Sequence, residues 1–313
     1  MTEKFQQVQI LHITEDNQFQ RIDNFLVTKL KGVPKSKVYR ILRKGEVRVN
    51  KKRIKPDYKL QIDDQVRVPP IRLESNDAKK LPSNKVVELL NDSILYEDDR
   101  LIVLNKPSGI AVHGGSGLNY GVIEGLRASR KQHEFLELVH RLDRDTSGCL
   151  LIAKKRSALR SLHQQLRDNQ VNKIYHALVR GYWPKTTQKV DAPLFKNTLQ
   201  GGERMVQVNP EGKTSLTLYK VLRAHERMSL VECKPITGRT HQIRVHCLHA
   251  GHPIANDSKY GDKHFDLIVK DLDCNRLFLH AYQISFIHPH TEEKVTFTAP
   301  YDKQLKNVVT KWM

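Results

Sequence analysis

The chain has 313 residues, enough for one large or two moderate domains, which excludes a small scaffold held together by disulfides or a metal. Its formal net charge of +19 makes a polyanion the first partner to consider, because fixed positive charges gain affinity by releasing counterions from phosphates. The longest apolar runs, such as 101–104 and 150–153, are far shorter than the roughly 18 residues of a membrane span. The four scattered cysteines are interpreted as reduced thiols, and the first residues lack a signal-peptide pattern, so we expect a cytoplasmic protein with no membrane partner.

Residues 20–72 carry most of this positive charge, with 16 Lys and Arg against five Asp and Glu, a net +11. Apolar residues recur at helical spacing over 22–30 and again over 38–42, and Gly45 is placed to end the second helix. The second helix leaves a cationic face, and a strand-like stretch with a cationic turn follows it. An ordinary solvated face is the alternative, but charge of one sign on a packed unit favours nucleic acid. The candidate contacts are Lys35, Lys37, Arg40, Arg43, Lys44, Lys51, Lys52 and Arg53.

Polar residues without apolar periodicity follow this segment, and we interpret 74–92 as a linker and 93–313 as a second domain. Two helices are expected there, at 157–169 and 240–251. The expected strands are too numerous and too irregularly spaced for repeating βαβ units. We therefore predict an α+β domain with a mixed, largely antiparallel sheet, preceded by a small α/β domain. The strand-like runs are 101–107, 149–155, 175–183, 215–222, 228–235, 277–289 and 294–300.

Three polar clusters interrupt the apolar framework of the second domain, at 105–115, 140–148 and 237–246. The middle cluster, HRLDRDTSG, differs from a protein-kinase loop because Leu142 separates Arg141 from Asp143, and it also departs from the dehalogenase pattern. The glycines near 114–121 have neither Rossmann nor P-loop spacing, so we expect a flexible loop. Four histidines, His241, His246, His249 and His252, invite a metal site, but no metal-binding pattern supports it.

A carboxylate among cations therefore remains as the candidate chemical group. Such an aspartate stays ionised near arginine and can act as a nucleophile or base, as carboxylates do at anomeric carbons in glycosyl chemistry. A salt-bridged loop without chemistry is the competing interpretation of HRLDRDTSG.

These residues closely resemble the RluA-type family of RNA pseudouridine synthases. The family pattern His-Arg-Leu-Asp-x-x-Thr-Ser-Gly is met in full by 140–148, and the resemblance continues through NKPSGIAVH, KIYHALVRG and TGRTHQIRVHCLHAGHPIANDSKYG, covering about 90–305. Residues 20–72 resemble the S4 RNA-binding domain through RIDNFL, PKSKVYRILRKGEVRVNKKRIKP and VRVP. The resemblance implies a pseudouridine synthase fold behind an S4 domain, and isomerisation of several uridines in large-subunit (23S) ribosomal RNA by a monomer without cofactor or metal.

The resemblance also implies roles for individual residues. Asp143 is the catalytic aspartate, whereas Asp145 occupies a variable position. Tyr175 matches the tyrosine that stacks on the target base, and Arg244 the arginine that pairs with the catalytic carboxylate. RNA contacts are implied for Arg141 beside the flipped nucleotide, for Ile243 in the wall of the uracil pocket and for His140 in the loop.

Each assignment has a simpler alternative. Tyr175 alternates with apolar residues and could belong to the core, Arg244 could be a surface arginine, and His140 could only orient the loop. For the whole protein, the alternative is a non-catalytic S4-type RNA-binding or ribosome-assembly factor. A decayed enzyme would be expected to have lost Asp143, Tyr175 or Arg244, and all three are present.

Overall fold

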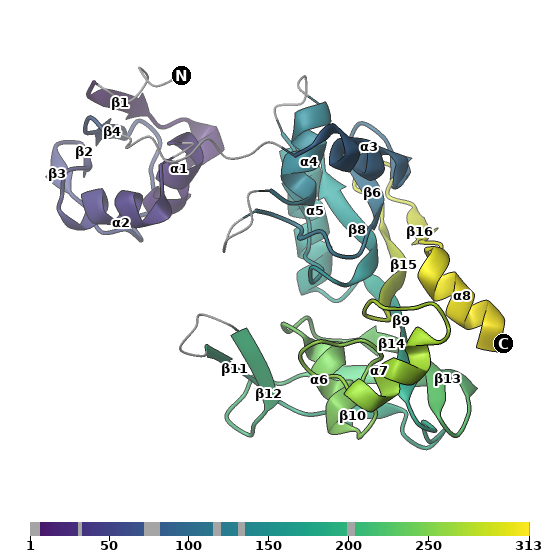
Figure 1. Cartoon of the computed structure of the whole chain (residues 1–313). Coiled ribbons are helices and arrows are strands. Elements are labelled where there is room, and N and C mark those ends of the chain that lie inside the picture. The colour runs from purple at the N-terminus through teal and green to yellow at the C-terminus, as the bar shows by residue number, and fades with distance from the viewer. Residues whose placement is uncertain are drawn as a thin grey trace. The chain divides into compact units, whose positions relative to one another are not determined.

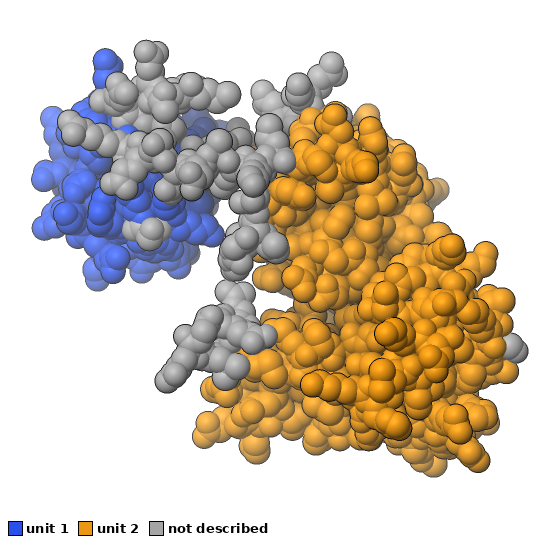
Figure 2. All heavy atoms as spheres, in the orientation of Figure 1, with its two compact units in different colours: residues 1–79 blue, residues 80–313 orange. Residues whose placement is uncertain are grey.

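The computed structural model describes residues 7–30, 33–71, 82–114, 120–130, 135–198 and 204–312 (Figure 1). The chain divides into two compact units, residues 1–79 and 80–313 (Figure 2), and each is described by itself. Residues 74–81 of the expected linker and 115–119 of the expected flexible loop lie outside the described residues. Within the described residues, no helix is long and apolar enough to cross a membrane.

The first unit packs two helices, α1 (Ile22–Lys29) and α2 (Lys35–Arg43), with a small sheet. The strands β1 (Gln9–His12), β2 (Arg48–Val49), β3 (Lys52–Arg53) and β4 (Gln65–Val68) lie in the order β1-β4-β2-β3. A short 3₁₀ helix, η2 (Glu15–Asn17), precedes α1. Both helices were expected from their apolar spacing, and their buried residues share one core with Val66 and Val68 of β4.

Local backbone conformations explain how α2 ends and how the cationic hairpin turns. Gly45 has a φ of 70° just past the helix, the left-handed conformation that glycine adopts without strain. Asn50 and Lys51 have φ values of 49° and 67° between β2 and β3, as a two-residue hairpin turn requires. Strand β1, which lies before the expected first residue of this domain, residue 20, pairs antiparallel with β4.

The second unit is built on a ten-stranded sheet in the order β10-β13-β14-β9-β15-β8-β6-β5, with β16 paired to β15 and β7 paired to β8. Only β15 and β8 run parallel among these pairs, so the predicted mixed, largely antiparallel sheet is confirmed. Its strands are β5 (Ile94–Glu97), β6 (Leu101–Lys106), β7 (Glu137–Leu138), β8 (Ser147–Ala153), β9 (Asn172–Arg180), β10 (Lys189–Asp191), β13 (Leu216–Ala224), β14 (Met228–Pro235), β15 (Leu279–Ile287) and β16 (Lys294–Thr298). A separate hairpin pairs β11 (Leu194–Thr198) with β12 (Arg204–Val208).

Helices cover this sheet and fix the ends of its strands. Helix α5 packs on β8 and β15, and α6 packs on β13 and β14. Both were expected, α5 with its end two residues earlier than predicted. The helices of this unit are α3 (Asn84–Asp92), α4 (Val122–Ser129), α5 (Arg156–Arg167), α6 (Gln242–His249), α7 (Lys263–Lys270) and α8 (Lys303–Trp312).

Helix α3 corrects the linker prediction. The interpretation of 74–92 as a linker is wrong for 84–92, because these residues form a helix of the second unit. Leu90 is fully buried, and a Cβ built on Gly125 of α4 would lie 2.4 Å from its side chain, so the two helices pack closely. Asn84, Lys85 and Glu88 are exposed on the other faces of this short amphipathic helix.

Candidate active site

A cavity of about 760 Å³ in the second unit brings the predicted site residues of this unit together. Its wall contains residues from the loop before β8, from β9, from the end of α5 and from the segment 235–244. All six predicted site residues of the second domain line it: His140, Arg141, Asp143, Tyr175, Ile243 and Arg244.

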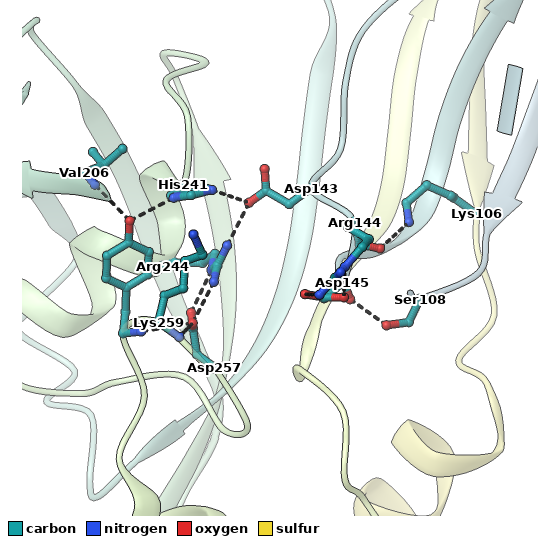
Figure 3. Close-up of polar contacts among 11 residues, drawn as sticks. Lys106, Ser108, Asp143, Arg144, Asp145, Val206, His241, Arg244, Asp257 and Lys259 are labelled. Atoms are coloured by element: carbon teal, nitrogen blue, oxygen red, sulfur yellow. Dashed lines mark hydrogen bonds and ion pairs between the residues drawn. The ribbon is translucent and has the colours of Figure 1, made fainter. Parts of the chain in front are cut away.

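Asp143 lies in the loop that leads into β8, and the polar cluster at 105–115 supports that loop (Figure 3). The buried ammonium of Lys106 donates hydrogen bonds to the carbonyls of Pro107, Ile110 and Arg144 at 2.8, 2.8 and 2.9 Å. Burial lowers the pKa of Lys106 to about 7. The Ser108 hydroxyl donates to the Asp145 carbonyl at 2.7 Å. The polar cluster at 105–115 therefore fixes the backbone of Arg144 and Asp145, the two residues that follow Asp143.

Arg244 joins Asp143 to a second carboxylate that was not predicted. Its Nη1 donates to Oδ2 of Asp143 at 3.2 Å, while Nε and Nη2 each donate to Asp257 at 2.7 Å. The side chain of Asp257 is fully buried, that of Arg244 is 5% exposed and that of Asp143 is 29% exposed. Burial alone would lower the pKa of Arg244, but the bonds to Asp257 and the charge of Asp143 outweigh it and raise that pKa.

The third polar cluster forms the start of α6. Gln242 accepts hydrogen bonds from the Thr237 hydroxyl and the Arg239 amide and donates to the Leu216 carbonyl, which fastens the preceding loop to β13. Arg244 follows in the first turn of the helix, so its guanidinium reaches the cavity while Ile243 packs into the core. The Arg244 guanidinium also lies 5.1 Å from the ring centroid of Tyr260.

Tyr175 on β9 lines the cavity and is half-buried. Burial, with the nearby charge of Asp143, raises the pKa of its phenol, so the ring is neutral at physiological pH. Tyr175 also packs against two hydrophobic clusters, so the simpler interpretation as a core residue holds for part of its surface.

Among the other residues of the HRLDRDTSG cluster (140–148), some line the cavity and others do not. Arg141 is exposed on its wall, and His140 accepts a hydrogen bond from the Leu151 amide through Nε2 at 3.2 Å. Burial lowers the pKa of His140 to about 4, so the neutral ring connects this loop to β8. Asp145 does not line the cavity and pairs instead with Nε of Arg144 at 3.0 Å.

Three of the four histidines considered as metal ligands have other partners. The ring of His241 contacts the Tyr260 hydroxyl, that of His246 the Thr217 hydroxyl and the Ala192 carbonyl, and that of His252 the Arg180 carbonyl. Within the part of the chain that the structure describes, no group of three or more His, Cys, Asp or Glu residues could hold a metal ion.

The candidate RNA contacts of the first unit lie on α2 and the β2–β3 hairpin. All are exposed except Lys37, which is half-buried. Arg53 donates to the Lys44 carbonyl at 2.8 Å, which joins the hairpin to the end of the helix. These cations therefore lie on neighbouring elements of one packed unit, and their contact with RNA stays a prediction.

Comparisons with known proteins agree with this geometry. The family model described as RNA pseudouridylate synthase matches residues 100–249, and the S4 domain model matches residues 20–66. The chain is 60% identical over 307 residues to ribosomal large subunit pseudouridine synthase C of Escherichia coli (strain K12), covering 97% of this chain and 96% of that protein. It is 59% identical over 305 residues to the protein of that name from Haemophilus influenzae, covering 97% and 95%.

Two solved structures of human proteins have a similar fold. RNA pseudouridylate synthase domain containing 4 superposes with a TM-score of 0.59 at 26% identity, covering 73% of this chain and 95% of that chain. RNA pseudouridylate synthase domain containing 1 superposes with a TM-score of 0.56 at 29% identity, covering 70% and 86%.

Proposed function

This chain belongs to the RNA pseudouridine synthase family, and we propose that it isomerises uridines to pseudouridine at several sites of large-subunit (23S) ribosomal RNA, with Asp143 as the reacting carboxylate. The observation that carries the assignment of Asp143 is its contact with Arg244 at 3.2 Å in a cavity that Tyr175 also lines.

The reaction breaks the bond between C1′ and N1 of uridine and joins C1′ to C5, with a proton lost from C5 and one gained at N1. Asp143 starts it either by attacking C1′ or by removing a sugar proton, and both routes need a carboxylate anion. The Arg244 guanidinium stabilises that anion. The rearrangement conserves all heavy atoms, so we assign no cofactor.

The target base must leave the RNA stack to reach this cavity, at a cost of a few kcal/mol. Tyr175 compensates for part of that cost by stacking, which is worth about 1 to 3 kcal/mol per base, and Ile243 closes the pocket around the detached uracil. Arg141, exposed on the cavity wall, contacts the flipped nucleotide, and His140 holds the loop behind it.

The first unit binds the RNA through its cationic surface, whose charge attracts phosphates. A ribosomal RNA substrate supports a cytoplasmic location, and a monomer stays a prediction. The presence of the complete set Asp143, Tyr175 and Arg244 around one cavity favours an enzyme over a non-catalytic assembly factor.

The Asp143→Asn variant tests this proposal. The amide keeps the shape of the carboxylate but supplies neither nucleophile nor base, so turnover is expected to fall below detection. RNA affinity should stay within about threefold, since the cationic surface of the first unit is unchanged. Pseudouridine is measured by mapping modified positions in 23S ribosomal RNA. Asp145→Asn is the matched control and should retain activity, and substantial pseudouridine formation by Asp143→Asn would contradict the assignment.

A further inference from the structure

The two oxygens of the Asp143 carboxylate have different surroundings (Figure 3). Oδ2 lies 3.2 Å from Nη1 of Arg244 and 3.8 Å from Nε2 of His241. Among the described residues no hydrogen bond or ion pair reaches Oδ1, and Asp143 lines the cavity. Arg244 thus holds Oδ2 with a hydrogen bond, and His241 faces the same oxygen at a separation longer than a hydrogen bond.

The hydrogen bonds of Tyr260 determine which nitrogen of His241 carries the proton. The Tyr260 oxygen accepts a hydrogen bond from the Val206 amide at 3.0 Å and lies 2.8 Å from Nδ1 of His241. Because the side chain of Tyr260 is buried and its oxygen already accepts from Val206, its single proton is donated to Nδ1. The remaining proton of the neutral imidazole then lies on Nε2, the nitrogen that faces Asp143.

The charges around His241 favour its neutral form. Burial, together with Arg244 and Lys259, lowers the pKa of His241, while Asp143 and Asp257 act in the opposite direction and are outweighed. Burial also raises the pKa of Tyr260, which keeps its proton available. His241 therefore points an uncharged N–H toward Oδ2 of Asp143 across 3.8 Å, whereas the cation Arg244 already donates a hydrogen bond to that oxygen.

The backbone at His241 is held in an uncommon conformation. Its φ is 54°, in the left-handed region, directly before the first residue of α6. For a residue other than glycine this conformation is strained, and it persists only where surrounding contacts determine it. The strained backbone and the Tyr260 hydroxyl together aim the ring at Asp143.

We propose that His241 is a positioning residue for Asp143, with its tautomer set by Tyr260: when RNA is bound, Nε2–H closes the 3.8 Å gap to Oδ2, which Arg244 already holds, and Oδ1 is the oxygen that reacts with the ribose. The inference rests on Asp143 being the reacting carboxylate. An uncharged donor restricts rotation of the carboxylate without neutralising the negative charge that the reaction uses. The effect of His241 should therefore be on kcat and not on KM for RNA.

A pair of variants that differ in reach tests this role. His241→Gln places an amide N–H near the position of Nε2, whereas His241→Asn is one methylene shorter and tolerates the left-handed backbone well. We expect His241→Asn to lower kcat about 10- to 100-fold, as misplacement of a reacting group does, and His241→Gln to recover most of that loss. The KM for RNA should stay within about twofold in both variants.

Tyr260→Phe tests the tautomer. It keeps the aromatic ring beside Arg244 and removes only the hydroxyl, so kcat should fall in the wild-type background and change little further in the His241→Gln background. Tyr301→Phe is the matched control, because Tyr301 also bonds Nδ1 of a histidine, His176, but does not line the cavity, and kcat should be unchanged.

Nitrogen NMR of histidine-labelled protein supplies a readout independent of activity. The His241 signal, assigned by its loss in His241→Gln, should show the proton on Nε2 in the wild type and a mixture of tautomers in Tyr260→Phe. Three results would overturn the proposal: a wild-type proton on Nδ1, equal losses of kcat in the Gln and Asn variants, or a Tyr260→Phe loss that persists in full in the His241→Gln background. Activity of Asp143→Asn would instead contradict the proposed function and leave the tautomer measurement valid.

Discussion

Arg244 binds two carboxylates in different ways, and the difference separates an anchoring group from a reacting one. Asp257 takes two nitrogens of the guanidinium in a fully buried pair and also accepts hydrogen bonds from the Lys259 and Tyr260 amides at 3.0 and 3.1 Å. Asp143 receives a single, longer bond and remains partly exposed. Asp257 therefore fixes the guanidinium, which in turn orients Asp143.

Replacing Asp257 by Asn should destabilise the second unit strongly at neutral pH. Burial raises the pKa of Asp257, but the hydrogen bonds and charge of Arg244 outweigh it, so the pKa is lowered in the folded state. Removing one partner of a buried pair costs about 3 to 5 kcal/mol. A lowered pKa contributes stability above the unfolded value of 3.8 and loses it as pH falls through the folded value, so the gap between wild type and variant should narrow in acid.

Urea unfolding at pH 7 and near pH 3, followed by tryptophan fluorescence, measures this difference. Both tryptophans, Trp183 and Trp312, lie in the second unit and report on it alone. Asp145→Asn is the control, since its partner Arg144 is exposed and such pairs are worth about 1 kcal/mol or less. A loss for Asp257→Asn no larger than for this control would be inconsistent with an anchoring role.

The sequence predicted the site residues that belong to a recognisable motif. It did not predict the residues whose role depends on being buried beside them. Asp143, Tyr175 and Arg244 were named by the family resemblance, and they line one cavity. Asp257 and Tyr260 lie in NDSKYG, whose composition is that of a surface loop. Residue spacing does not show that this loop packs against Arg244 and that Asp257 accepts its hydrogen bonds. His241 was considered only as a metal ligand.

At the scale of secondary-structure elements, strands and helices with long apolar runs were predicted from the sequence, whereas short polar elements were not. The strands β6, β8, β9, β13, β14, β15 and β16 and the helices α1, α2, α5 and α6 were all expected. The two-residue strand β7 and the short strands of the β11–β12 hairpin have too little apolar periodicity to be recognised. Helix α3 was hidden among polar residues for a similar reason.

The junction of the Asp143 loop with β8 depends on Gly148. It has a φ of 106°, and a Cβ at this position would lie 2.3 Å from the Ala281 carbonyl oxygen of the parallel strand β15. Gly148→Ala should therefore lower the free energy of unfolding of the second unit by about 3 kcal/mol, from backbone strain and overpacking together. It should also lower kcat, because the loop that carries Asp143 must shift.

Gly109→Ala is the matched control for this prediction. Its φ of 85° is also left-handed, but no heavy atom lies within 4 Å of the added Cβ, so only the backbone strain of about 1 kcal/mol applies. Urea unfolding by tryptophan fluorescence compares the two variants. Equal losses would mean that close approach of β15 to β8 does not constrain this position.

At the scale of the whole molecule, charge and chemistry are divided between the two units. Residues 20–72 carry +11 of the total charge of +19, whereas Asp143, the proposed reacting carboxylate, and its partners lie in the second unit. The first unit has its own hydrophobic core, so its cationic surface does not depend on the sheet of the second unit. RNA affinity and turnover should therefore be separable by substitution.

A fourfold substitution of that surface tests the division: Arg40, Arg43, Lys44 and Lys52 to Gln. All four side chains are exposed, so folding should be retained. Each phosphate contact contributes about 0.7 to 0.9 to the slope of log K against log salt, so the slope should flatten by about 3 and RNA binding should weaken, most at low salt. Turnover of saturating RNA should change little.

The control replaces four exposed lysines of the second unit, Lys263, Lys270, Lys303 and Lys306, which removes the same charge. Binding titrations from low to high salt compare the two variants, and an equal flattening in both would mean that net charge, and not the surface on α2 and its hairpin, attracts the RNA.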